Sequence, residues 1–345
     1  MAVVRGYRNY RGRTPKWKAV LAAVLVLVIL AAICVIVLQR HIVYDETGTP
    51  HLELFWQETP KQTAPEEPGE VELTIQKAEP REITAFTVPE GMLTQEAWAD
   101  AAARAAVTEE QSWNAAAVTV KDSAGSVYFD SGTAVSGSVK IAEDTAAALA
   151  EITGEDSGFY TIARLSCFHD PKAANDSVEE MGLKNTGGYI FYDGNNSQWL
   201  DPGKPAARQY LCEIAREAAE LGFDEILLTD VGYPTEGSLD KIAYTGPEPP
   251  EDMVVRFLQE MKDALEPCGT ALSVELPETV VSEGADENAG LSLAKIAPLV
   301  DRVYVKTAPE QAEALAQAVT AAGGTAFAAE VTAYSPELRG SCLVY

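Results

Sequence analysis

The chain has 345 residues, of which 47% are hydrophobic and 23% charged, and its formal net charge is −26. This length suffices for one large domain or two ordinary ones, and the apolar fraction predicts a substantial core. A chain this acidic repels nucleic acid and anionic lipid headgroups, which bind cationic partners, so we expect no nucleic-acid partner. The same charge also serves solubility without any partner.

The N-terminal region separates basic from apolar residues. Residues 1–18 contain Arg and Lys but no acid, and the first acid of the chain is Asp45. Residues 19–38, AVLAAVLVLVILAAICVIVL, are apolar and uncharged. A helix of this length, rising about 1.5 Å per residue, spans the roughly 30 Å hydrocarbon core of a bilayer. The sequence therefore predicts a cytoplasmic tail at 1–18 and a single transmembrane helix at 19–38, with the rest of the chain outside the cell.

A cleaved signal peptide is the alternative to this uncleaved anchor. Signal peptides carry apolar regions of about 7–15 residues that end in a small-x-small cleavage site. Here the apolar run is longer and passes directly into Gln39 and Arg40 without such a site. The bulky Ile33 before Cys34 does not fit a lipoprotein site either. The sequence thus favours a signal-anchor in the cell membrane.

Residues 39–79 connect the predicted anchor to the remainder of the chain. HLELFW, at 51–56, is a candidate short strand. The segment 57–70 is rich in Pro, Glu and Thr and lacks a hydrophobic period, which predicts an extended linker. The chain beyond it contains four scattered cysteines, too few for a disulfide scaffold. One bridge is an alternative, but the sequence favours buried thiols at Cys167, Cys212, Cys268 and Cys342.

From residue 80 to 345, short β-branched or apolar runs alternate with helical patterns. The predicted strands are Ile83–Val88, Ala115–Val120, Tyr160–Ser166, Glu225–Asp230, Thr270–Leu276, Arg302–Lys306, Thr325–Val331 and Cys342–Tyr345. The predicted helices lie near 94–111, 143–152, 205–221, 251–265, 290–298 and 308–322. A helix between successive strands implies parallel strands joined by right-handed crossovers. Eight such strands predict a (β/α)8, TIM-type barrel, with an open doubly wound α/β sheet as the alternative.

Several kinds of chemistry are excluded by motif. The chain has no G-x-x-x-x-G-K-[ST] phosphate loop, no G-x-S-x-G nucleophile elbow, and no G-x-G-x-x-G after a predicted strand. Only His169 lies in the predicted barrel, because His41 and His51 precede it. A His-rich zinc site is therefore disfavoured, as is a Ser-His-Asp triad unless His169 supplies its base. We expect neither a metal nor a cofactor.

Carboxylates remain as candidates for catalysis, because barrel enzymes place their chemistry at the C-terminal ends of the strands. The acids at predicted strand ends are Asp122, Asp170, Asp230, Glu275 and Glu330. Two carboxyls about 5–5.5 Å apart suit retaining glycoside hydrolysis, and about 6.5–9.5 Å suits inversion. With 52 acidic residues in the chain, some reach strand ends by chance. Glu275 is distinguished from the others by its apolar neighbours Val274 and Leu276.

The segment from about Cys167 to Lys204 reads as a long loop rich in aromatic and amide side chains. It contains Phe168, Tyr189, Phe191, Tyr192, Trp199, Asp193, Asn195, Asn196 and Asp201. Aromatic faces stack on sugar rings and Asp or Asn side chains bond hydroxyls, and long barrel loops are often functional. The alternative is that the aromatic rings only cap the barrel, with Asp193-Gly194-Asn195 forming a tight turn.

Three segments resemble a family of bacterial glycoside hydrolase-like proteins with a TIM-barrel fold, whose members are often membrane-anchored. The resemblance covers about residues 82–335. It rests on AVTVKDSAGSVYFDS (117–131), YTIARLSCFHDPKAA (160–174) and WLDPGKPAARQYLCEIAREAAELGFDEILLTDVGYP (199–234). These match the family's Lys-Asp-x-x-Gly turn, its Ala-Arg strand with the later Asp-Pro, and its Trp-x-Asp-Pro before a helix and the fourth strand.

The fourth strand departs from the family pattern, which ends like Phe-Asp-Tyr-x-Arg-Phe-Pro. Thr229 stands at the family's Asp position and Gly232 at its Arg position, while Asp230 comes one residue later. Side chains alternate along a strand, so this shift is expected to turn the Asp230 carboxylate to the other face unless a bulge intervenes.

The resemblance implies an enzyme that acts on a cell-envelope or extracellular polysaccharide. Its expected catalytic carboxylates are Glu275, together with Asp230 or Glu330. Its expected substrate-binding residues are Asp122, Arg164, His169, Trp199 and Tyr233. Two alternatives stay open: a catalytically degenerate carbohydrate-binding barrel, and a surface scaffold whose acidic domain meets protein partners.

Overall fold

The computed structural model describes residues 42–44, 50–52, 81–106, 112–336 and 338–345. The predicted tail, transmembrane helix and Pro/Glu-rich linker all lie outside these ranges. No helix within the ranges combines the length and apolarity that a membrane crossing requires.

The chain divides into two units, Met1–Ile75 and Gln76–Tyr345. In the first, strands β1 (Ile42–Tyr44) and β2 (Pro50–Leu52) pair antiparallel. Strand β2 overlaps the start of the strand expected at 51–56, and the rest of that segment lies outside the description.

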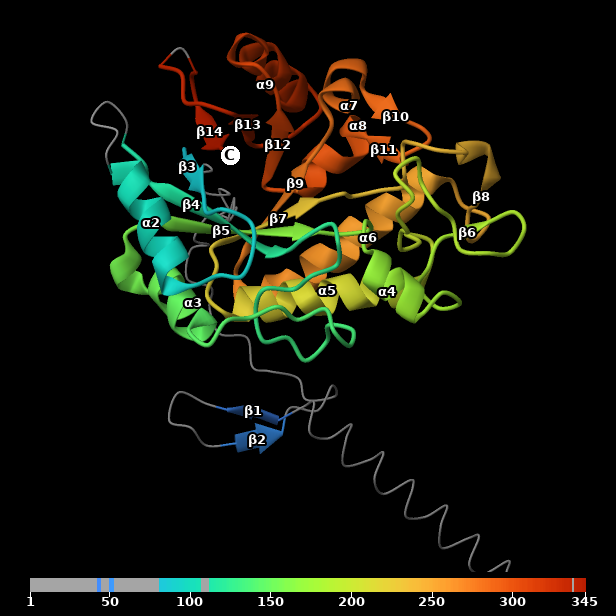
Figure 1. Cartoon of the computed structure of the whole chain (residues 1–345), viewed down its shortest axis with the longest axis horizontal. Helices are drawn as coiled ribbons and strands as arrows, with labels where there is room; N and C mark the ends of the chain where they lie inside the picture. Colours follow the sequence, from blue (N-terminus) through green and yellow to red (C-terminus); the bar gives the residue numbers. More distant parts are fainter. Residues whose placement is uncertain (1–41, 45–49, 53–80, 107–111, 337) are drawn as a thin grey trace, which may run out of the picture. The chain divides into compact units, whose positions relative to one another are not determined.

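The second unit is a closed barrel of eight parallel strands (Figure 1). The strands in barrel order are β3 (Thr84–Thr87), β4 (Ala115–Lys121), β5 (Tyr160–Ser166), β7 (Glu225–Thr229), β9 (Ala271–Glu275), β12 (Arg302–Lys306), β13 (Phe327–Val331) and β14 (Ser341–Val344). Strand β14 pairs with β3 and closes the ring. Each of the eight predicted strands is confirmed to within two residues at either end, and so is the barrel.

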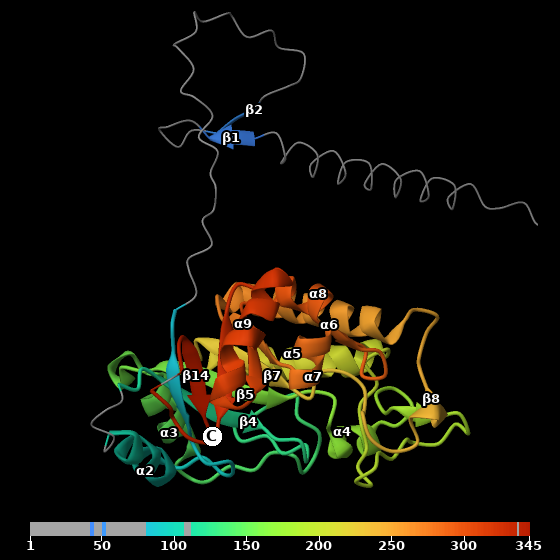
Figure 2. The same ribbon diagram turned by 90° about the horizontal axis from the view of Figure 1, so that it is seen from above.

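Helices surround this barrel. They are α2 (Gln95–Ala106), α3 (Thr145–Thr153), α5 (Pro205–Glu220), α6 (Pro250–Leu265), α8 (Leu293–Ile296) and α9 (Ala312–Ala321). Figure 2 shows α2 and α3 on the opposite side of the barrel from α6 and α8. Helix α5 begins at Pro205 and is followed by Gly222 at φ +99°, as the sequence predicts from the terminal preferences of these residues.

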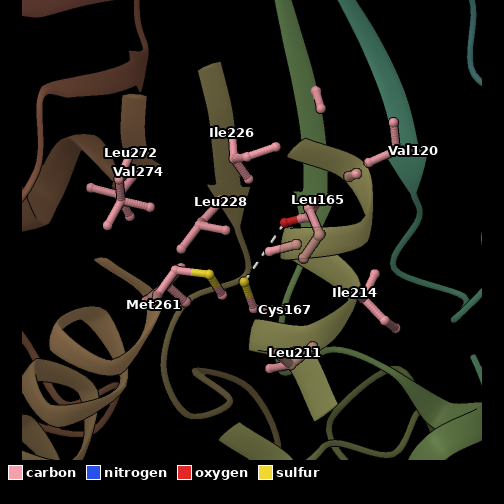
Figure 3. Close-up of a cluster of buried hydrophobic side chains, with 14 of the residues drawn as sticks. Val120, Leu165, Cys167, Leu211, Ile214, Ile226, Leu228, Met261, Leu272 and Val274 are labelled. Atoms are coloured by element: carbon pink, nitrogen blue, oxygen red, sulfur yellow. Dashed lines mark hydrogen bonds between the residues drawn. The ribbon is translucent and has the colours of Figure 1, made fainter. Parts of the chain in front are cut away.

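The strands divide their side chains between the barrel interior and the helices. In β7, Leu227 belongs to the interior cluster, whereas Ile226 and Leu228 pack in the layer under the helices (Figure 3). The same layer receives Leu211 and Ile214 from α5 and Met261 from α6. This period of two follows from the pleat of a strand, and each buried Leu or Ile contributes about 1.5–3 kcal/mol. The alternation decides which strand-end residues reach the barrel axis.

Short elements that the sequence did not predict stand at the C-terminal ends of the strands. They are α4 (Pro171–Asp176), α7 (Glu278–Glu283), the antiparallel pair β6 (Lys184–Asn185) and β8 (Ile242–Ala243), and the pair β10 (Ala285–Asp286) and β11 (Leu291–Ser292). In Figure 1 the arrowheads of β5 and β7 point toward α4, β6 and β8. The segment from Cys167 to Lys204 is therefore partly ordered into a helix and a strand rather than being one long loop.

All four described cysteines are free thiols, as the sequence favours. Cys167, Cys212 and Cys342 are buried as predicted, whereas Cys268 is exposed, so the prediction of a buried thiol is wrong at that position. Burial raises the pKa of the Cys212 thiol to about 12 and that of Cys342 to about 11. These two thiols therefore stay protonated near neutral pH and act as small apolar side chains.

Candidate active site

A cluster of four charged side chains occupies the barrel mouth at the C-terminal ends of the strands. Arg164 of β5 donates to Glu275 of β9 (Nη2 to Oε2, 2.7 Å) and to Glu330 of β13 (Nη1 to Oε2, 3.1 Å). Lys306 of β12 donates to the second oxygen of Glu275 (Nζ to Oε1, 2.7 Å). Each of these four residues lies two positions after an inward-facing residue of its own strand. Side chains two positions apart point to the same face of a strand, so all four meet near the barrel axis. Two cations thus flank Glu275, while one guanidinium bridges both carboxylates.

Glu330 is the deepest member of this cluster. Its side chain is fully buried, and Oε1 has no hydrogen-bond partner among the described residues. Burial raises the pKa of Glu330 to about 7, and the Glu275 charge adds to this, although Arg164 opposes it. Glu330 therefore exchanges its proton near neutral pH, underneath Arg164.

Asp230 follows the last residue of β7 and has a left-handed backbone, with φ +51°. Aspartate tolerates this conformation better than most residues. The carboxylate accepts hydrogen bonds from Ser166 (Oγ to Oδ2, 2.6 Å) and Thr229 (Oγ1 to Oδ2, 3.3 Å). The expectation that the one-residue shift turns Asp230 to the other face is therefore wrong, because the left-handed residue redirects the side chain into the mouth.

Gly232 explains the second departure from the family pattern. Its φ is +126°, and a Cβ built on it would lie 2.5 Å from the Ala289 carbonyl oxygen. The neighbouring Tyr233 amide donates to the same carbonyl at 2.9 Å. The loop after β7 and the β10–β11 segment thus meet backbone to backbone, and a side chain at position 232 does not fit.

Two adjoining cavities open at the mouth. The first, about 210 Å³, is called the side cavity and lies over β7, β9 and the β10–β11 segment. The second, about 230 Å³, is called the axial cavity and receives residues from the ends of β4, β5, β7, β9 and β12. Asp230, Glu275 and Lys306 line both cavities. Glu330 lines neither, so its catalytic role stays a prediction.

An aromatic platform borders the side cavity. Trp199 lines this cavity and stacks on His169, with ring centroids 4.5 Å apart and an interplanar angle of 3°. Its indole Nε1 donates to Asp193 Oδ2 at 2.9 Å, and His169 Nε2 lies 2.8 Å from Ser197 Oγ. The aromatic segment predicted from the sequence therefore reaches the mouth through Trp199, and His169 supports it from behind.

Asp122 and Tyr233, both predicted to bind substrate, lie on different cavities. Asp122 lines the axial cavity and accepts from the Ser126 amide at 2.6 Å and the Tyr128 hydroxyl at 2.8 Å. Burial, followed by this carboxylate, raises the pKa of Tyr128 to about 12. Tyr233 lines the side cavity and packs edge-on against Tyr244, and burial raises its pKa too.

Asp170 lines neither cavity and has a structural role instead. Its carboxylate pairs with Lys121 (Oδ2 to Nζ, 3.0 Å), both side chains being fully buried. It also accepts from the Ala173 amide and so caps helix α4. Lys121 in turn donates to the Ser166 carbonyl at 2.8 Å and lines the axial cavity. The pair thus fixes the loop that follows β5 beside Asp230.

Three further residues that line the axial cavity, Lys121, Ser166 and Lys306, are not among the site residues predicted from the sequence. A signal was present: all three continue the inward-facing series of their strands. Among the described residues, no group of three or more His, Cys, Asp or Glu side chains is arranged to hold a metal ion. The chemistry available at this mouth is that of carboxylates with cationic and hydroxyl partners.

Solved structures resemble this barrel. The glycoside hydrolase domain of PgaB (BpsB) from Bordetella bronchiseptica is 15% identical, with a TM-score of 0.51 over 73% of this chain and 84% of that one. A cycloisomaltooligosaccharide glucanotransferase from Paenibacillus is 14% identical, with a TM-score of 0.50 over 72% of this chain and 38% of that one. A hypothetical protein from Ruminiclostridium thermocellum is 28% identical, with a TM-score of 0.46 over 55% and 96%. The first two likenesses show the fold alone.

A sequence profile identifies the family. No match is found among curated proteins. The profile of a family described as "Putative glycosyl hydrolase domain" matches residues 92–309, which run from just before α2 to just beyond β12 and include Asp230, Glu275 and Trp199. Since this match spans more than half of the chain, the protein belongs to that glycosyl hydrolase domain family.

Proposed function

We propose that this protein is a glycoside hydrolase that cleaves a cell-envelope or extracellular polysaccharide, with Asp230 and Glu275 as its two catalytic carboxylates. The observation that carries the proposal is that both carboxylates line both cavities, so a glycan lying across the mouth contacts both. Glycosidases use two such groups, one as acid and the other as nucleophile or base. The predicted anchor at 19–38 would hold the barrel outside the cytoplasmic membrane.

The surroundings of the two carboxylates suggest separate roles. Glu275 lies between Arg164 and Lys306. These two cations favour an ionised carboxylate, which suits the role of nucleophile or base facing the positively charged sugar ring of the transition state. Asp230 receives neutral hydroxyl donors, and among the described residues both reach Oδ2. Oδ1 of Asp230 is thus left to contact the glycosidic oxygen of the substrate. This position suits the catalytic acid, which donates a proton to that oxygen.

The test is release of reducing ends from purified envelope polysaccharides by the full-length protein. We expect Glu275→Gln to reduce release by about 10³-fold or more, because the neutral amide cannot stabilise the transition-state charge. Glu283→Gln is the matched control, since this exposed glutamate ends α7 outside both cavities. Equal release by wild type and Glu275→Gln would remove Glu275 from the proposed pair.

A glycan-binding barrel without hydrolysis is the second candidate function. It is favoured by Thr229, which stands where the family resemblance predicts an acid, and by cations that already engage both oxygens of Glu275. This candidate predicts that the polysaccharide is retained by the protein with no reducing ends released. Binding that is lost in Trp199→Ala, in the absence of turnover by wild type, would decide for it.

A further inference from the structure

The two cavities of the mouth differ in the chemistry of their walls. The axial cavity is lined by charged and hydroxyl side chains, including Lys121, Asp122, Arg164, Ser166 and Thr229. Such a wall suits a sugar ring that presents only hydroxyl groups. The side cavity has a wall that is partly apolar, formed by Val231, Leu276, Pro277, Ala289 and Leu291. An unsubstituted sugar can offer this wall only the C–H face of its ring, whereas a substituent with a methyl group can enter the cavity and contact the wall directly.

The apolar wall is held by backbone contacts and not by loose side chains. The Tyr233 amide donates to the Ala289 carbonyl at 2.9 Å, and Gly232 allows that approach. Val231, Leu276, Ala289 and Leu291 are all at least 95% buried, so they offer a fixed surface. A preformed pocket of this kind discriminates by shape and polarity.

Polar groups flank the same wall. Lys306 is half exposed, and to the residues that the structure describes its ammonium donates one hydrogen bond, to Glu275, of the three that it can donate. Asp230 and Glu278, which carry carboxylates, also line this cavity. Hydrogen-bond donors and acceptors therefore surround a small apolar surface.

We infer that the side cavity is a specificity subsite for the N-acetyl group of a hexosamine residue. This inference rests on the proposed function and names the substrate class of that same site. An acetamido group presents one methyl, one N–H donor and one carbonyl acceptor. The methyl meets the apolar wall, a carboxylate accepts from the N–H, and the Lys306 ammonium donates to the carbonyl. Trp199, at the edge of the cavity, offers its face to the sugar ring.

Two other sugar types fit this cavity less well. A free amino sugar carries an ammonium group in place of the acetamido group. It therefore has no methyl group to contact the apolar wall. A 6-deoxy sugar supplies a methyl but has no amide for the surrounding donor and acceptors, which then lose hydrogen bonds to water without replacement. Burial of one methyl, by itself, gives roughly fivefold in affinity.

Saturation-transfer difference NMR tests the inference with the full-length Glu275→Gln protein, in which turnover is suppressed. The probes are N-acetylglucosamine, N-acetylgalactosamine, glucosamine, glucose and fucose. We expect the N-acetyl methyl protons to receive the strongest saturation, and the two N-acetylated sugars to bind at least fivefold more tightly than the other three. Leu291→Asn, which makes the wall polar, should remove this preference.

Controls separate the wall from the fold. Ile141→Asn changes an exposed apolar side chain outside both cavities and should leave the preference intact. If Leu291→Asn does not fold, Ala289→Val takes its place. This substitution narrows the same cavity without adding a polar group and should weaken the binding of the N-acetylated sugars only. Equal binding of glucose and N-acetylglucosamine, or preferred binding of fucose or glucosamine, overturns the inference and leaves glycan binding intact. Absence of binding by all five sugars also overturns the inference, whereas the proposed function is judged separately by the release of reducing ends from polysaccharide by the wild-type protein.

Discussion

The two ends of the barrel interior each hold an arginine against carboxylate groups, but they differ in their access to solvent. At the N-terminal end, Glu225 accepts from the Tyr304 hydroxyl at 2.7 Å and lies 3.6 Å from Arg302 Nε. The side chains of Glu225 and Arg302 are 1% and 4% exposed. At the mouth, the side chains of Arg164 and Glu275 are 13% and 17% exposed.

The difference shows how a charge cluster that holds the fold is distinguished from one that serves a site. The lower cluster is closed: Arg302 also donates to the Ser341 hydroxyl and the Arg81 carbonyl, both at 2.9 Å. Burial raises the pKa of Tyr304 well above its usual value, and Glu225 adds to this, so Tyr304 remains a hydrogen-bond donor. The upper cluster opens into two cavities. Removal of the Glu275 charge should therefore mainly change function, and removal of the Glu225 charge should mainly change stability.

The largest expected effect concerns Asp230. Asn keeps the shape of this side chain and tolerates φ +51°, but it cannot donate a carboxylic proton. Asp230→Asn should lower kcat on a cleavable polysaccharide by about 10²–10⁴-fold and leave the melting temperature essentially unchanged. Asp240→Asn, at an exposed position in the same loop, is the control for kcat and for thermal melting. Full activity in Asp230→Asn would show that Asp230 is not the acid.

The second prediction compares the same type of substitution, Glu to Gln, at the two ends of the barrel interior. Glu225→Gln leaves the buried Arg302 without its counter-charge and should lower the free energy of unfolding by about 3 kcal/mol. Glu275→Gln should lower it by less, because the side chain of Lys306 is 49% exposed and Arg164 keeps Glu330 as a partner. Urea denaturation of the two variants and wild type measures both values. Equal losses would mean that the mouth cluster holds the fold as firmly as the lower one.

The barrel itself could be predicted from the sequence, because each strand carries a short apolar or β-branched run and most strands are separated by amphipathic helices. Helix α6 shows the reason: Val254, Phe257, Leu258, Met261 and Leu265 recur at helical spacing, and all are buried. Such periodic signals are local and can be recognised without knowledge of the tertiary contacts. The short elements α4 and α7, six residues each, carry no full period and depend on tertiary contacts instead.

The site was predictable in its residue types more than in its geometry. The position of Glu275 at the end of an apolar strand predicts it, the family resemblance predicts Arg164, and both reach the mouth. The orientation of Asp230 depends on one backbone angle after β7, which no residue pattern reveals. The depth of Glu330 depends on Arg164 lying above it, a contact between residues 166 positions apart. Pairings of this kind are decided by the closed barrel rather than by any local sequence.

The third prediction uses the buried acid beneath the mouth. The folded-state pKa of Glu330 is raised from 4.5 to about 7, so its contribution to stability is fully present below about pH 4.5 and is lost as the pH rises through 7. Glu330→Gln removes this dependence. The stability of wild type relative to this variant should fall by on the order of 2 kcal/mol between pH 5 and pH 8. Urea denaturation across that range measures it, and parallel pH curves for the two proteins would contradict the buried position of Glu330.

The smallest expected effect tests the platform that makes the mouth a binding site. Trp199→Ala removes the ring that lines the side cavity and stacks on His169, and should weaken glycan binding by about tenfold, or about 1.4 kcal/mol. Trp199→Phe keeps an aromatic face but loses the hydrogen bond to Asp193, so it separates stacking from loop positioning. Calorimetry with the polysaccharide gives both affinities, and thermal melting shows whether either variant disturbs the fold. Near wild-type affinity in Trp199→Phe and a loss in Trp199→Ala would assign the effect to the ring face, whereas equal losses would assign it to the Asp193 contact.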